Sequence, residues 1–118
     1  MQIKFQKISY SAEGLEPIYQ YGVDLDSLLD KELSLQHLES YLWTPEKIQD
    51  LIDESLALQE DEEIEYQVDG GHLFMIIDKN EVFFYNSLEN KKEEDFIWPL
   101  AQFIEFLQDF KKFVEENS

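Results

Sequence analysis

The second half of the chain constrains the fold most, because residues 63–116 combine three strand-like segments with one long amphipathic helix. Apolar and polar side chains alternate over residues 63–69, which is the period-2 pattern of a strand with one buried face. Residues 73–77 are continuously apolar, as in a central strand that is covered on both faces. Residues 82–85 form a third apolar segment, so the sequence predicts an antiparallel meander.

Turn-forming residues separate these strands, and a helix follows them. The Asp-Gly-Gly at 69–71 supplies the positive φ angles that a tight hairpin turn needs, and residues 78–80 turn the chain again. After a charged loop at 91–95, Pro99 opens a helix with apolar residues at helical spacing. The stripe consists of Leu100, Phe103, Ile104, Leu107, Phe110 and Val114. We expect this helix to lie across the sheet.

The first half of the chain adds strands and short helices. Residues 1–10 predict a strand with a bulge near Lys7, because the apolar positions shift by one residue there. This strand can pair with either edge of the meander. Residues 18–21 predict a short strand, and Asp24 and Ser34 predict the N-caps of two short helices.

A third short helix has the clearest start signal in the chain. Thr44 is the predicted N-cap, Pro45 occupies the first helical position, and Trp43 and Ile48 form a hydrophobic staple. Inward positions are expected at Leu35, Leu38, Tyr41 and Leu42 in the second helix, and at Ile48, Leu51, Ile52 and Leu56 in the third.

These elements predict a single α+β domain over residues 1–118. It has an antiparallel meander sheet with an N-terminal strand, three short helices before the meander and a long C-terminal helix packed on the sheet.

The chain has no cysteine, which excludes a disulfide framework and a thiol nucleophile. No apolar run approaches the about 18 residues of a membrane span, and no signal-peptide core is present. We therefore expect a cytoplasmic protein.

The net charge of −18 comes from 27 acidic residues against 9 lysines, with no arginine. Such a charge repels nucleic acid and anionic membranes and steers basic partners toward the surface. Solubility alone is an alternative explanation. Salt adaptation is another, but it fits less well because lysine, isoleucine and phenylalanine are plentiful.

Two acidic segments are the candidate partner-binding sites. They contain Asp24, Asp26, Asp30, Glu60, Asp61, Glu62 and Glu63, chosen on charge density alone. The first segment resembles the start of a calcium loop, but Leu29 replaces the glycine that such a loop needs at its sixth position. The second segment suits either a basic partner or a solvated loop.

No catalytic motif is present in the sequence. His37 and His72 are isolated and lie in no HExxH pattern, and no serine has the GxSxG context of a nucleophile. Gly70 and Gly71 are too few for a phosphate cradle, and no basic patch suits nucleic acid. We expect no enzymatic activity, no metal and no cofactor.

Aromatic residues offer a second kind of binding surface. Phe106 and Phe113 lie about a quarter turn from the helical stripe, so they either widen the core face or form an exposed aromatic ridge. Four tyrosines are further candidate interface anchors: Tyr19, Tyr21, Tyr66 and Tyr85.

Five features of the chain point to one class of protein: its size, its acidity, the meander at 63–87, the loop at 91–95 and the final segment that begins Phe96-Ile97-Trp98-Pro99-Leu100. In these features the chain resembles the immunity proteins of bacterial toxin–antitoxin competition systems. These include the immunity proteins of contact-dependent inhibition. The resemblance implies a protein that neutralises one cognate toxin, frequently a nuclease, by tight binding. An acidic surface competes for the cationic cleft in which a nuclease holds phosphates. Alternatives are a nucleic-acid mimic that occupies a DNA-binding protein, and an enzyme with an unrecognised motif.

Overall fold

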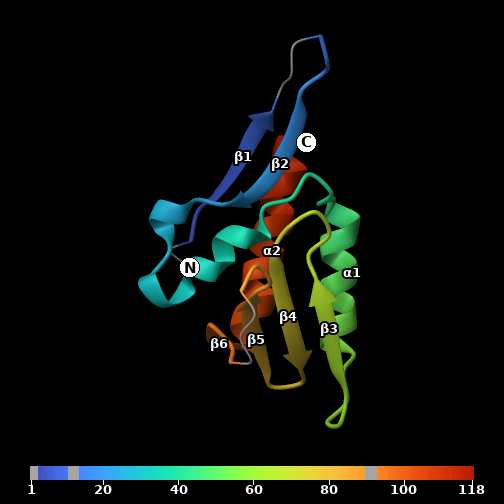
Figure 1. Cartoon of the computed structure of the whole chain (residues 1–118). Coiled ribbons are helices and arrows are strands. Elements are labelled where there is room, and N and C mark those ends of the chain that lie inside the picture. The colour runs from blue at the N-terminus through green and yellow to red at the C-terminus, as the bar shows by residue number, and fades with distance from the viewer. Residues whose placement is uncertain (1–2, 11–13, 90–92) are drawn as a thin grey trace.

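The structure, a computed structural model, describes residues 3–10, 14–89 and 93–118. Within these ranges the chain forms a two-stranded and a four-stranded antiparallel sheet together with helices, which confirms the predicted α+β class (Figure 1). The strands are β1 (Phe5–Tyr10), β2 (Ile18–Val23), β3 (Glu63–Gln67), β4 (Leu73–Asp78), β5 (Glu81–Asn86) and β6 (Phe96–Pro99). The 3₁₀ helices are η1 (Leu25–Ser27) and η2 (Asp30–Leu38), and the α-helices are α1 (Pro45–Leu56) and α2 (Leu100–Asn117).

The predicted meander is confirmed as β3-β4-β5, and β6 extends it to four strands. Trp98 of β6 lies opposite Val82, and Phe96 lies opposite Phe84. Phe96 and Trp98 are buried while Ile97 and Pro99 are exposed, which is the alternation of a strand. The sequence does not predict β6, because a four-residue segment is too short for its period to be recognised.

The N-terminal strand does not join the meander. It pairs with β2 in a separate sheet, in an unbroken register from Phe5↔Val23 to Tyr10↔Ile18. The predictions of a bulge near Lys7 and of pairing with a meander edge are therefore wrong. A pairing between neighbouring segments closes a shorter loop, and it costs less chain entropy than a pairing across the domain.

The β1–β2 hairpin covers one side of α2. The ring of Phe5 lies 5.4 Å from that of Phe106, 5.2 Å from Phe110 and 5.8 Å from Phe113. Phe106 is 1% exposed and Phe113 is partly buried against the core. These two residues widen the core face of α2, and the interpretation of an exposed aromatic ridge is wrong.

The short helices match the predictions only in part. Asp24 caps η1, since its Oδ1 accepts a hydrogen bond from the backbone N–H of Asp26 at 3.0 Å. Ser34 lies inside η2 and does not begin a helix. Tyr41 and Leu42 follow η2 and are exposed, contrary to their predicted inward positions.

The start of α1 is as predicted, and its end differs. The Oγ1 of Thr44 accepts a hydrogen bond from the backbone N–H of Lys47 at 3.1 Å, and Pro45 is the first helical residue. Ile48, Leu51 and Ile52 are buried, whereas Leu56 at the C-terminus of the helix is 60% exposed. Leu56 was predicted to face inward, but the helix ends there and the chain turns away.

The core forms between one face of the four-stranded sheet, the two α-helices and η2. The predicted stripe on α2 is confirmed, with Phe103, Ile104, Leu107, Phe110 and Val114 buried and Leu100 partly buried. The sheet contributes alternate residues of its strands: Leu73, Met75, Ile77, Val82, Phe84, Phe96 and Trp98. In Figure 1, α2 runs behind β4 and β5, on the side of the sheet that carries these residues.

Candidate protein-binding surface

The two acidic segments chosen from the sequence lie in different parts of the molecule. In Figure 1 the segment around η1 lies beside the lower end of the β1–β2 hairpin, and the segment before β3 lies at the opposite side of the view. Asp24 and Asp26 line a small hollow of ≈ 250 Å³ together with Lys4 and Ser27. Since Asp24 caps η1, its carboxylate stabilises the start of this helix in addition to contributing negative charge to the surface.

Residues Glu60, Asp61, Glu62 and Glu63 lie at one end of the four-stranded sheet. Oε1 of Glu60 is 3.8 Å from Nζ of Lys79 in the β4–β5 turn. Oε1 of Glu62 accepts a hydrogen bond from the backbone N–H of Gln59 at 2.8 Å. Glu63 is exposed and begins β3. The segment therefore continues directly into the edge strand of the sheet.

The second face of the sheet carries an apolar row across three of its strands. Ile76 lies opposite Phe83, and Phe83 lies opposite Ile97, so the three side chains share one face. On the other side of Ile76 the row ends with Glu65 of the edge strand β3. This row alternates with the core residues of the same strands, as a strand's period of two requires.

A second row parallels the first. Phe74 lies opposite Tyr85, with ring centroids 5.8 Å apart, and Gln67 of β3 lies opposite Phe74. We call the surface formed by Phe74, Ile76, Phe83, Tyr85 and Ile97 the outer face. The prediction that residues 73–77 are covered on both faces is wrong, because Phe74 and Ile76 are only partly buried.

The outer face is separate from the core. The buried cluster and the partly buried side chains packed against it include Ile64 and Tyr66 of β3, which belong to the opposite face. Ile97 at the β6 end of the row is 40% exposed. The sequence gives no signal for an outward Ile97, because Phe96, Ile97 and Trp98 are all apolar and only their burial alternates in β6.

Acidic residues border the outer face. Glu63 and Glu65 are exposed on β3, and Glu63 lies opposite Asp78. Glu81 lies opposite Pro99 at the end of β5. We call Glu63, Glu65, Asp78 and Glu81 the acidic rim. Burial raises the pKa of Tyr85 on the outer face, and the carboxylates of Glu94 and Glu63 raise this pKa further.

The four tyrosines considered as anchors have different environments. Tyr19 is 43% exposed on β2, and Tyr85 lies on the outer face. Tyr21 is buried, and its hydroxyl donates to the carbonyl of Asn117 at 3.2 Å. Tyr66 stacks on Trp43, and burial first, then Asp69 and Glu54, raises its pKa to about 12. Of these four tyrosines, Tyr19 and Tyr85 have side chains that a partner can contact.

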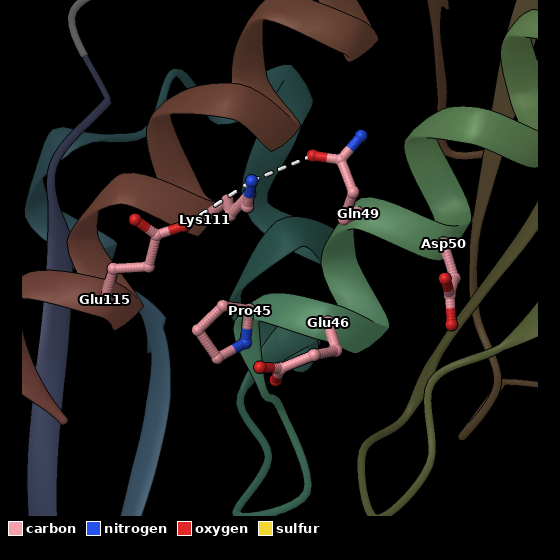
Figure 2. A pocket seen from close by; sticks show the side chains of 6 residues that line it. All are labelled: Pro45, Glu46, Gln49, Asp50, Lys111 and Glu115. Carbon is pink, nitrogen blue, oxygen red and sulfur yellow. Dashed lines mark hydrogen bonds and ion pairs between the residues drawn. The ribbon is translucent and has the colours of Figure 1, made fainter.

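A polar hollow of ≈ 340 Å³ lies between α1 and α2 and is lined by Pro45, Glu46, Gln49, Asp50, Lys111 and Glu115 (Figure 2). Nζ of Lys111 donates to Oε1 of Gln49 at 2.9 Å and is 3.4 Å from Oε1 of Glu115. Lys111 is thus already paired with neighbouring side chains and is not free to activate a substrate. The lining residues include no histidine, serine or cysteine, so the hollow lacks a nucleophile–base pair.

An apolar hollow of ≈ 550 Å³ lies at the end of the sheet near the acidic rim. Its lining consists of Leu56, Lys79, Asn80, Pro99, Leu100, Ala101 and Ile104. Pro99 lies opposite Glu81, so this hollow borders the acidic rim at the end of β6. The exposed Leu56 closes its other side.

The two histidines, which looked isolated in the sequence, come together in space. The rings of His37 and His72 lie 6.3 Å apart, and the backbone N–H of His72 donates to the carbonyl of His37 at 3.1 Å. Burial and the nearby His72 lower the pKa of His37, against the opposing effect of Asp95 and Glu89. In the part of the chain that the structure describes, no three potential ligands form a metal site, and no helix is long and apolar enough to cross a membrane.

Comparisons of the chain with protein-family models, with curated proteins and with solved structures found no match. What the chain binds must therefore follow from the chemistry of its own surface. That surface combines a strong negative charge with an apolar sheet face bordered by carboxylates.

Proposed function

We propose that the chain is a non-enzymatic acidic inhibitor that binds and neutralises a basic cognate protein. More specifically, we propose an immunity protein that acts in the bacterial cytoplasm against a nuclease toxin. The observation that carries the proposal is the net charge of −18 on a chain of only 118 residues.

The few positive charges do little to offset this negative field. Among the described residues, lysines form ion pairs with carboxylates: Lys47 with Asp69, Lys79 with Glu60 and Lys111 with Glu115. Lys7 donates to the carbonyl of Asn117 at the C-terminus of α2, where the helix dipole favours a cation. The excess carboxylates remain to attract a basic partner.

Electrostatic attraction of this kind acts mainly on the rate of association. Opposite fields on two proteins raise the association rate constant toward about 10⁸ M⁻¹s⁻¹ or more at low salt, and screening reduces it as salt rises. A nuclease supplies the opposite field, since its phosphate-binding cleft is cationic. Fast binding suits an inhibitor that must intercept a toxin before the toxin reaches nucleic acid.

The proposal is tested with any toxin domain that is encoded beside the gene of this chain. The tagged chain is mixed with that purified domain at low and at physiological salt, and growth is measured in cells that express the toxin with or without the chain. We expect a one-to-one complex that persists at physiological salt, and rescue of growth. The proposal fails if the chain retains many unrelated basic proteins at low salt and none at physiological salt.

A further inference from the structure

We propose that the outer face, with its acidic rim, is the surface that binds the basic partner. This inference rests on the proposed function and adds its location and the chemistry of the partner. The partner would present a central apolar or aromatic group surrounded by lysine or arginine side chains.

The centre of the outer face has the composition of a binding hot spot. Three aromatic rings and two isoleucines lie in two adjacent rows across β4, β5 and β6. Large, rigid side chains give much contact area for little loss of conformational entropy, and aromatic residues are enriched where binding energy concentrates. A contiguous apolar patch bordered by polar residues is also what distinguishes an interaction surface from scattered exposed apolar residues.

Charge identifies the kind of partner. The rim places Glu63 and Glu65 along the β3 edge, and Asp78 and Glu81 at the end of β4 and the start of β5. Carboxylates at the border of an apolar centre steer lysine and arginine toward the face. The rings of Phe74, Phe83 and Tyr85 can then accept those cations as cation–π partners.

The same charges argue against a second copy of this chain as the occupant. A two-fold symmetric pair uses the same surface patch on both copies. Such a pair would place the rim carboxylates of both copies in one interface, where the outer face offers no basic side chain to pair with them and like charges repel. A basic protein pairs with the rim and covers the apolar rows at the same time.

The outer face also differs from the other acidic surfaces of the molecule. The hollow between α1 and α2 is acidic, but it is lined mainly by polar side chains and by the engaged Lys111. The hollow near Asp24 already contains a cation, Lys4. Neither combines carboxylates with a row of aromatic residues.

The test uses the wild-type chain labelled with ¹³C at the isoleucine methyl groups, which avoids any variant that fails to fold. The probe is a short peptide in which arginine alternates with tryptophan. Ile76 and Ile97 report on the outer face, while Ile48 and Ile52 on α1 are buried and serve as internal controls. A peptide of arginine and serine with the same charge separates apolar contact from charge alone.

We expect the methyl signals of Ile76 and Ile97 to shift with peptide concentration while those of Ile48 and Ile52 stay in place. The serine peptide should bind about tenfold more weakly, because it buries less apolar surface. Equal affinity of the two peptides, no shift at Ile76 and Ile97, or shifts confined to α1 would overturn the inference. So would shifts at Ile76 and Ile97 that depend on the concentration of the chain alone, since these would indicate a second copy.

This experiment separates the two proposals. If the cognate toxin binds at physiological salt but the peptide avoids the outer face, the location is wrong and the inhibitory function stands. If the peptide binds the outer face but the toxin domain neither binds nor is neutralised, the inhibitory function is wrong.

Discussion

The indole Nε1–H of Trp98 donates a hydrogen bond to Oε2 of Glu32 at 3.1 Å, although 66 residues separate the two in the chain. Both side chains are buried, with 3% and 6% of their surface exposed. The bond joins β6, the strand at one edge of the four-stranded sheet, to η2. It therefore holds the edge strand, and with it the outward Ile97, against the rest of the domain.

Removing the carboxylate of Glu32 is expected to destabilise the fold. The Glu32→Ala variant leaves the buried indole N–H without its partner, which costs about 1–3 kcal/mol in the free energy of unfolding. The Glu32→Gln variant keeps an acceptor oxygen and should lose less. Urea denaturation measures both, with the exposed Glu46→Ala as the control. Equal stability of all three variants would show that the bond contributes nothing.

The Phe5→Ala variant tests how the β1–β2 hairpin is held on α2. Phe5 contacts three phenylalanines of α2, and its loss should lower the free energy of unfolding by about 2 kcal/mol, below the 3–5 kcal/mol of a fully buried phenylalanine. Amide hydrogen exchange should accelerate first in β1 and β2. The control is Ile18→Ala on the same hairpin, because Ile18 is 55% exposed. An equal effect of the two changes would contradict the docking role of Phe5.

Charge reversal at the β3 edge should slow association with a basic partner. The Glu63→Lys and Glu65→Lys changes together place two positive charges on the rim and should reduce the association rate constant by about tenfold at low salt. The salt dependence of that rate should also become flatter. Stopped-flow fluorescence measures both quantities. Reversal of Glu46 and Asp50, which line the hollow between α1 and α2, is the matched control.

The acidic segments chosen on charge density are compared in the same assay. Reversal of Glu60, Asp61 and Glu62 should slow association, because this segment leads into the rim. Reversal of Asp24, Asp26 and Asp30 should have a smaller effect, because these residues lie apart from it in Figure 1. A larger effect at Asp24–Asp30 than at Glu60–Glu62 would place the partner near η1.

Alkaline pH should destabilise the fold through Tyr66. Burial raises its pKa from 10 to about 12, so the folded state favours the neutral phenol. This contribution to stability is complete below pH 10 and is lost as the pH rises through about 12. Denaturation midpoints across this range should fall less steeply for Tyr66→Phe, which has no ionisable hydroxyl. Parallel pH profiles for the two proteins would contradict this role.

Local sequence signals determined most of the elements of this fold. Alternation over residues 63–69 placed β3, and the apolar runs at 73–77 and 82–85 placed β4 and β5. The helical stripe from Phe103 to Val114 placed the core face of α2, and Thr44 with Pro45 placed the start of α1. These signals succeed because strand period, helix period and capping depend on residues within a few positions of one another. The acidic character of the surface is likewise a property of composition.

The tertiary structure alone decided which elements meet and which faces stay uncovered. The pairing of β1 with β2, the burial of Phe106 under Phe5, and the exposure of Tyr41 and Leu56 all depend on contacts between distant segments. The continuous apolar run at 73–77 is equally compatible with burial on one face or on both. Because α2 covers one side of the sheet, alternate residues of that run entered the core, and Phe74 and Ile76 were left on the outer face.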